Sequence, residues 1–235
     1  MTRPEGSNKD QLTAPFDSDA ATTGWIEIDL SHLSKNIRVF RSYMQEGQIL
    51  IGSVKANAYG LGVVGISQAL VNAGCEMLAC GSLSEARQVR RAGITAPILL
   101  FGRPVGNLLP QVAAEGYLPT IHNREHARIL ANAVNDQPVT AYLKVDAGLG
   151  RLGIPIEEAE EAVVEMNALP GLRIAGLYTH VPFETPAQAI MTQKNIDAFA
   201  ILVDQLKGRG ISFDVIQATA SSAVLAGLRD PFNAV

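Results

Sequence analysis

The feature that most constrains the fold is a regular alternation of short apolar segments with longer amphipathic segments after Gly24. Such alternation predicts a parallel sheet joined by right-handed helical crossovers. The expected strands are residues 49–56, 76–82, 97–102, 118–122, 139–146, 172–180 and 213–220. The expected helices are residues 63–74, 83–93, 107–116, 123–135, 155–169, 185–210 and 221–228. Seven such units are close to the eight of an α/β (β/α)8 TIM-like barrel, so we expect a barrel that lacks its last strand and leaves two edges unpaired.

A doubly wound open sheet is the main alternative to the barrel. No G-x-G-x-x-G follows any expected strand, so its dinucleotide-binding form has no support. Ahead of the seven units, alternation predicts a strand at residues 25–30, and helical spacing predicts a helix at residues 31–44 capped by Asp29 or Ser31. The helix after the second strand is expected to begin near Ser84.

Composition excludes several classes of function. Hydrophobic residues make up 47% of the chain and the net charge is −4, which indicates a globular protein without affinity for nucleic acid. No apolar run predicts a membrane span. Cys75 and Cys80 lie in apolar surroundings and are expected to be reduced core thiols, which favours a cytoplasmic protein. Residues 1–24 are polar and lack a secretory core, so we expect an extension without a core, followed by one barrel domain over 25–235.

Polar side chains recur where the expected strands end, which is where barrels place their catalytic groups. They are Lys55, Asn57, Tyr59, Lys144, Asp146, Arg151, Tyr178, His180, Ser221 and Ser222. Each has an ordinary structural interpretation: a solvated lysine, a flexible arginine loop, a hydrogen-bonded histidine or a serine helix cap. The functional interpretation is a desolvated lysine with a lowered pKa that forms an imine, a guanidinium facing an oxygen, and a phosphate at a helix start.

Taken together, these groups predict a pocket for pyridoxal phosphate. No G-x-S-x-G and no convincing metal-ligand cluster occur, so hydrolases and metalloenzymes have no support and no metal is expected. The motifs VKANAYGLG (54–62) and KVDAGLGRLG (144–153) resemble those of the alanine racemase family. GLYTH, ATASSA and the opening WIEIDLSHLSKNI match that family in order, and the resemblance extends from residue 25 to residue 235.

The resemblance implies a fold-type III pyridoxal 5'-phosphate enzyme that interconverts L- and D-alanine for peptidoglycan, as a homodimer when full-length. It implies that Lys55 holds the cofactor as an imine and is one of two catalytic bases. Tyr59 and Ser222, beside Ser221, would bind the phosphate. The family usually has Asn-Ser where this chain has Ser221-Ser222, which leaves a hydroxyl but alters nearby contacts.

The same resemblance assigns three further residues. Arg151 would contact the phenolic oxygen of the cofactor, and His180 would lie beside the pyridine ring. Lys144 occupies a position that is often carbamylated in the family, where it helps to orient the arginine. Leu61 stands where the family usually has histidine. Both departures weaken strict specificity for alanine and leave serine as a second substrate.

Two other interpretations remain open. In the family the second base is a tyrosine from the C-terminal domain of the partner subunit, so this chain is expected to be a truncated form that racemises poorly alone. A single-domain barrel that binds pyridoxal phosphate without catalysis, and so buffers its supply, is the first alternative. A D-amino-acid aldolase or dehydratase is the second, although such enzymes need a metal held beyond the residues present.

Deleting residues 1–24 is expected to leave both cofactor affinity and the melting temperature nearly unchanged, because this segment lacks apolar periodicity. Fluorescence titration with pyridoxal phosphate and thermal unfolding of the two proteins check this. A large loss of either property would show that the extension packs on the barrel.

Overall fold

The structure is a computed structural model, and it describes residues 26–102, 108–133 and 137–235. The expected extension, residues 1–24, lies outside these ranges. The described helices are α1 (Leu30–Arg41), α2 (Lys55–Tyr59), α3 (Val63–Asn72), α4 (Leu83–Arg91), α5 (Leu108–Ala114), α6 (Arg124–Asn132), α7 (Ile156–Asn167), α8 (Ala189–Gly208) and α9 (Ser221–Leu225), with a 3-10 turn η1 (Pro186–Gln188). The strands are β1 (Ile51–Ser53), β2 (Met77–Cys80), β3 (Ile98–Leu100), β4 (Leu118–Ile121), β5 (Val139–Asp146), β6 (Ile154–Pro155), β7 (Leu172–Tyr178) and β8 (Val215–Gln217).

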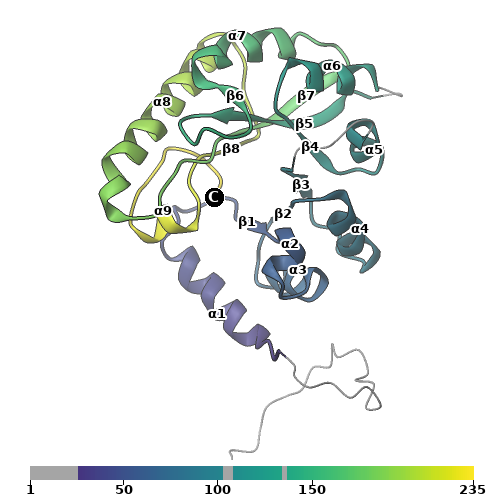
Figure 1. The fold of residues 1–235 in the computed structure, drawn as a ribbon, viewed down its shortest axis with the longest axis vertical. Helices are drawn as coiled ribbons and strands as arrows, with labels where there is room; N and C mark the ends of the chain where they lie inside the picture. The colour runs from purple at the N-terminus through teal and green to yellow at the C-terminus, as the bar shows by residue number, and fades with distance from the viewer. Residues whose placement is uncertain (1–25, 103–107, 134–136) are drawn as a thin grey trace, which may run out of the picture.

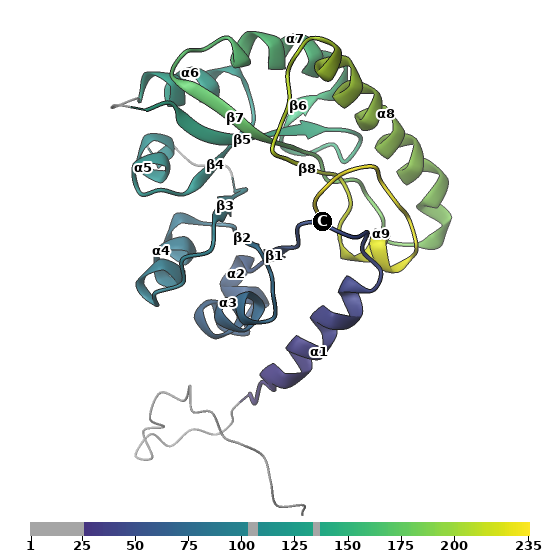
Figure 2. The same ribbon diagram turned by 180° about the vertical axis from the view of Figure 1, so that it is seen from behind.

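All seven predicted strands are present in one parallel sheet. Their order is β1-β2-β3-β4-β5-β7-β8, and every pair is parallel. A doubly wound sheet would reverse its strand order part-way, whereas this order runs in one direction. Figures 1 and 2 show the strands following a curve with helices α3 to α8 around its outer side. The two-residue β6 pairs with β5 beside this path and was not predicted.

The expectation that two sheet edges remain unpaired is wrong, because the end of the chain lies between them and pairs with both. No eighth core strand is described, but Ala234 forms parallel bridges with both Ile49 and Gln217. The Ile49 N–H donates to the Asn233 carbonyl at 2.8 Å, and the Ile51 N–H donates to the Val235 carbonyl at 2.7 Å. Figures 1 and 2 both show the C-terminus between β1 and β8. The last three residues therefore occupy the place of the eighth strand and join the two edges.

Alternate strand residues divide the apolar core into an inner and an outer layer. On β2, Met77 and Ala79 belong to the inner cluster, and Leu78 and Cys80 face the helices. The inner cluster comprises Met77, Ala79, Leu99, Tyr142, Ala175, Tyr178, Val215 and Ala234. Larger outer clusters pack the strands against the surrounding helices. A period of two along each strand thus fills the barrel and leaves only the strand ends for chemistry.

Three local predictions need correction. Residues 26–29 form no strand; Ile26 is 80% exposed, and Asp29 instead caps α1 by accepting from the Ser31 N–H. The helix expected at residues 83–93 begins at Leu83, as predicted, but ends at Arg91; its cap is Ser82, whose hydroxyl accepts from the Glu85 N–H. The strand expected at residues 49–56 stops at Ser53, since the backbone changes hand after Lys55.

The two cysteines are free and buried, as predicted. Burial raises the pKa of Cys75 to about 11 and that of Cys80 to about 12, so both thiols are protonated at neutral pH. Within the described ranges, every helix is too short or too polar to cross a membrane.

Gly176→Ala is expected to destabilise the protein by about 1–3 kcal/mol, because a Cβ there would lie 2.4–2.6 Å from ring atoms of the buried Tyr142. Gly208→Ala is the matched control, since a Cβ at the end of α8 would meet nothing within 4 Å. The control is expected to be neutral or stabilising by up to about 1 kcal/mol. Urea unfolding checks both, and equal stability of the two variants would contradict the packing described.

Candidate active site

Lys55 begins a turn of left-handed helix. Ala56, Asn57, Ala58 and Tyr59 all have φ between 52° and 57°, and Gly60 continues at 86°. This conformation costs a residue with a side chain about 1–2 kcal/mol, so four of them cost about 4–8 kcal/mol. The glycines at 60 and 62, with φ of 86° and 94°, allow the tight loop expected from the sequence. Nothing in the sequence indicated that the four residues before these glycines would be left-handed.

Asn57 holds this turn to its surroundings by three different groups. Its backbone N–H donates to the Glu85 carboxylate at 2.9 Å, and its carbonyl accepts from the Gly62 N–H at 3.0 Å. Its side-chain oxygen accepts from the Val63 N–H at 2.8 Å, where α3 begins. These bonds, together with Ala58 N–H to the Val54 carbonyl at 2.9 Å, stabilise the strained turn.

The turn places Lys55 beside two aromatic rings. The Lys55 Nζ atom is 5.7 Å from the centre of the Tyr59 ring and 5.9 Å from that of Phe101, which follows β3. The Tyr59 hydroxyl is 3.4 Å from the Ser53 hydroxyl. Lys55 and Tyr59 are both exposed, so the predicted desolvation of the lysine is not present in this structure.

Asp146 organises the loop that carries Arg151. One of its carboxylate oxygens accepts from the N–H groups of Gly148, Leu149 and Gly150, and the other accepts from the Arg151 N–H at 2.7 Å. Partial burial acts to raise the pKa of Asp146, but these four donors outweigh it and hold the pKa below its usual value. The loop after β5 is therefore a built structure, not the flexible segment of the ordinary interpretation.

Lys144 lies on the inner side of β5, two residues from Tyr142, and is 7% exposed. Its amine donates to the Leu152 carbonyl, within the arginine loop. Burial lowers its pKa, the Asp146 charge acts against that shift, and the Arg151 charge adds to it. The neutral form of this amine is therefore more populated than that of a lysine on the surface.

His180 lies within the electrostatic influence of charged residues from the ends of other strands. Its pKa is lowered by burial first, and then by the positive charges of Arg151, Lys144 and Lys55. The structure therefore brings residues from the ends of β1, β5 and β7 close enough for their charges to act on His180. We refer to Lys55, Tyr59, Lys144, Arg151, His180 and Ser222 as the strand-end cluster.

The two serines start α9, as expected, and both are exposed. The Ser222 hydroxyl donates to the Phe183 carbonyl at 3.0 Å, which ties α9 to the loop that follows His180. Tyr178, another strand-end residue, is instead buried in the barrel, with its hydroxyl 3.1 Å from that of Thr120. Tyr178 therefore belongs to the core and not to the strand-end cluster.

Two contributors were missed from sequence, Glu85 and Phe101. Glu85 had a usable signal, because Ser82-Leu83-Ser84-Glu85 matches the capping-box pattern. Phe101 ends an ordinary apolar strand, and no sequence pattern distinguishes it from a core residue. Within the part of the chain that the structure describes, no group of acidic, histidine and cysteine side chains could hold a metal ion.

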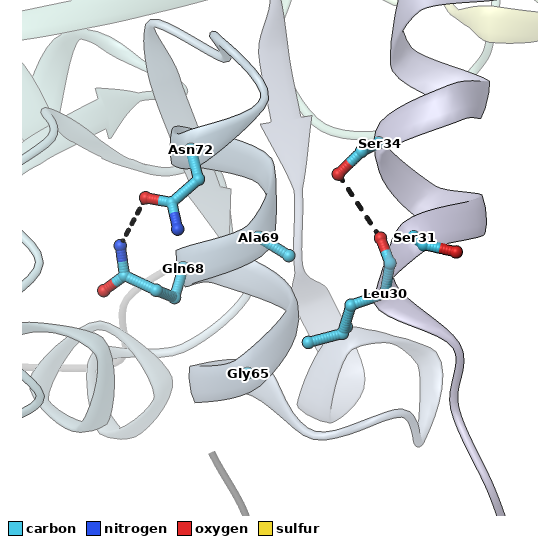
Figure 3. Close-up of a pocket in the computed structure, with 7 residues that line it drawn as sticks. All are labelled: Leu30, Ser31, Ser34, Gly65, Gln68, Ala69 and Asn72. Atoms are coloured by element: carbon cyan, nitrogen blue, oxygen red, sulfur yellow. Dashed lines mark hydrogen bonds between the residues drawn. The ribbon is translucent and has the colours of Figure 1, made fainter. Parts of the chain in front are cut away.

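A separate surface groove lies between α1 and α3 (Figure 3), and its lining residues are Leu30, Ser31, Ser34, Gly65, Gln68, Ala69 and Asn72. Three of its polar side chains bond within their own helices: Gln68 donates to Asn72 at 2.9 Å, and Ser34 donates to the Leu30 carbonyl at 3.3 Å. No member of the strand-end cluster lines this groove, so it is not the candidate active site.

Comparison with known proteins places this arrangement in a family. A family model described as "Alanine racemase, N-terminal domain" matches residues 28–235. The chain belongs to the alanine racemase family. The alanine racemase of Nostoc sp. is 33% identical over 217 residues, covering 90% of this chain and 56% of that protein. The alanine racemase of Synechocystis sp. is 35% identical over 210 residues, covering 86% of this chain and 55% of that protein.

A solved structure of alanine racemase from Bacillus anthracis with bound L-Ala-P has the same fold. Its TM-score is 0.83 at 28% identity, covering 94% of this chain and 57% of that one. The chain thus spans a little over half the length of the alanine racemases it matches. The part it shares is the barrel of the N-terminal domain.

Acid should destabilise the wild-type protein more than a His180→Gln variant. Burial and three cations lower the pKa of His180, so its folded-state value lies below the ordinary value of about 6.5. Stability from the neutral imidazole is complete above about pH 6.5 and is lost as the pH falls through the folded pKa. Melting temperatures between about pH 7.5 and 5.5 check this. Identical curves for the wild type and the His180→Gln variant would contradict the assignment.

Proposed function

We propose that this chain supplies the pyridoxal-phosphate-binding barrel of an alanine racemase, with Lys55 as the residue that holds the cofactor. The observation that carries the proposal is the charge of the strand-end cluster. Burial lowers the pKa of His180 most, and the positive charges of Arg151 and Lys55 lie close enough to add to that shift. Such a group of cations favours an anionic ligand, and an exposed primary amine among them can react with an aldehyde.

The donor set fits pyridoxal phosphate group by group. The Lys55 amine matches the aldehyde, the Arg151 guanidinium matches a phenolic oxygen, and hydroxyls of Tyr59 and Ser222 match a phosphate. The Ser222 hydroxyl donates to the Phe183 carbonyl, and it would donate to a phosphate oxygen instead when the cofactor binds. Burial and then the neighbouring positive charges lower the pKa of His180, which favours a neutral imidazole beside a ring.

When bound, pyridoxal phosphate supplies an electron sink that makes the α-hydrogen of an amino acid acidic. Lys55 then acts on one face of the substrate, where its Nζ atom takes the α-proton or returns it. The left-handed turn fixes where that amine stands, and the Tyr59 and Phe101 rings limit its directions. A second base on the opposite face is required for inversion.

Lys144 is proposed to be carbamylated. Only a neutral amine adds carbon dioxide, and burial lowers the pKa of this lysine in the direction that favours the neutral form. A carbamate there would carry a negative charge next to the arginine loop. The Lys144 amine already donates to the Leu152 carbonyl of that loop. The carbamate would then orient Arg151 toward the cofactor oxygen.

Several wider assignments rest on the family. We propose a homodimer in which the partner subunit supplies the second base, and D-alanine destined for peptidoglycan as the product. Alanine is the proposed substrate, with serine as a second one because Leu61 and Ser221 depart from the usual residues. The free buried thiols favour a cytoplasmic location.

The second candidate function is a single-domain protein that binds pyridoxal phosphate without catalysis. Lys55 would hold the cofactor in that case as well. Reaction with alanine therefore separates the two, whereas cofactor binding does not.

Borohydride reduction of the protein with pyridoxal phosphate, followed by peptide mapping, should label Lys55. Lys55→Ala should abolish that label, and Lys194→Ala, on exposed α8, should retain it. In deuterium oxide, residues 1–235 should exchange the α-hydrogen of one alanine enantiomer faster than they invert it, since the described site offers Lys55 as its base on one face.

Each result decides a different point. A label on another lysine alone would overturn the assignment of Lys55. Labelling of Lys55 without any α-hydrogen exchange would favour the non-catalytic alternative. Inversion as fast as in a two-domain racemase would contradict the need for a second base from a partner.

A further inference from the structure

We propose that Glu85 is a positioning residue for Lys55: its carboxylate joins the left-handed turn after β1 to the end of β2. The inference rests on the proposed function of Lys55. Glu85 lies in the first turn of α4, where the capping box gives it an ordinary structural role as well. Its contacts extend beyond that role, because they include a second strand end.

The two carboxylate oxygens have different partners. One accepts from the N–H groups of Gly81 and Ser82, both at 3.0 Å, which completes the capping box at the end of β2. The other accepts from the Asn57 N–H at 2.9 Å, inside the turn that carries Lys55. A single side chain therefore fixes the distance between the ends of two neighbouring strands.

Lys55 lies against one of these attachment points and is two residues from the other. A Cβ added to Gly81 would be 3.2 Å from the Lys55 Cβ, so the root of the lysine rests against the backbone that Glu85 holds. The Asn57 N–H lies two residues further along. Movement of either strand end would turn the Lys55 side chain relative to the strand-end cluster.

A carboxylate is required at this position because all of its partners are donors. Glutamine has one acceptor oxygen, so its other terminal group would place N–H donors against the Asn57 N–H. Glu85→Gln therefore keeps the size of the side chain and can keep the helix cap, while it loses the bond to the turn. Ser82→Ala is the matched control, since it removes the hydroxyl that caps α4 and leaves the bond to Asn57 intact.

Three measurements on the full chain test the proposal: affinity for pyridoxal phosphate, the rate at which borohydride fixes the cofactor on Lys55, and the pH dependence of the absorbance of the lysine–cofactor adduct. Glu85→Gln should weaken the affinity and slow the labelling by about tenfold or more and shift the pH profile. Ser82→Ala should change each by less than about threefold while lowering the melting temperature similarly. Glu85→Asp, which keeps the charge, should recover part of the loss.

Equal effects of Glu85→Gln and Ser82→Ala on affinity, labelling and pH profile would overturn the proposal and leave Glu85 as a helix cap. Native-state hydrogen exchange in the wild type gives a second test that needs no variant. The Asn57 amide should be strongly protected, and a freely exchanging Asn57 amide would also overturn it. Absence of any Lys55 label in the wild type would instead refute the proposed function.

Discussion

The interaction on which the site depends is the set of hydrogen bonds that holds residues 56–59 in a left-handed turn. The backbone resists this conformation, so the surrounding structure has to impose it. Asn57 contributes its N–H, carbonyl and side-chain oxygen to three partners in Glu85, Gly62 and Val63. Strand β1 is consequently short, three residues separate the turn from α3, and Lys55 leaves the barrel at one defined point. A right-handed path would carry the amine elsewhere.

The second constraint is electrostatic. Carboxylates lie close to the strand-end cluster, but backbone N–H groups occupy them: four donate to Asp146 and three to Glu85. Their hydrogen-bonding capacity therefore builds loops and does not pair the cations Lys55 and Arg151. Burial, and then these cations, lower the pKa of His180. An anionic cofactor with an aldehyde fits this balance, since it satisfies the positive charges and supplies a partner for the amine.

The sequence predicted the sheet and most of the cluster because both depend on local periodicity. Apolar runs fixed the seven parallel strands, and polar residues at their ends located Lys55, Arg151 and His180. Tertiary contacts decided the rest. The hand of the turn depends on Glu85, 28 residues away, and the joining of β1 to β8 depends on Ala234. The alternation at residues 25–30 failed as a strand signal, because a helix cap at Asp29 took over its end.

The stability of an Ala56→Gly variant tests the central claim most directly. Glycine adopts positive φ without the steric penalty of alanine, so at φ 52° the substitution should be neutral or raise the free energy of unfolding by up to about 1 kcal/mol. The control is Ala198→Gly in the right-handed helix α8, which should lower it by about 1 kcal/mol. Urea unfolding of the two variants compares the signs of these changes in the free energy of unfolding. A loss of stability at residue 56 equal to that at residue 198 would contradict the left-handed turn and, with it, the account of how Lys55 is placed.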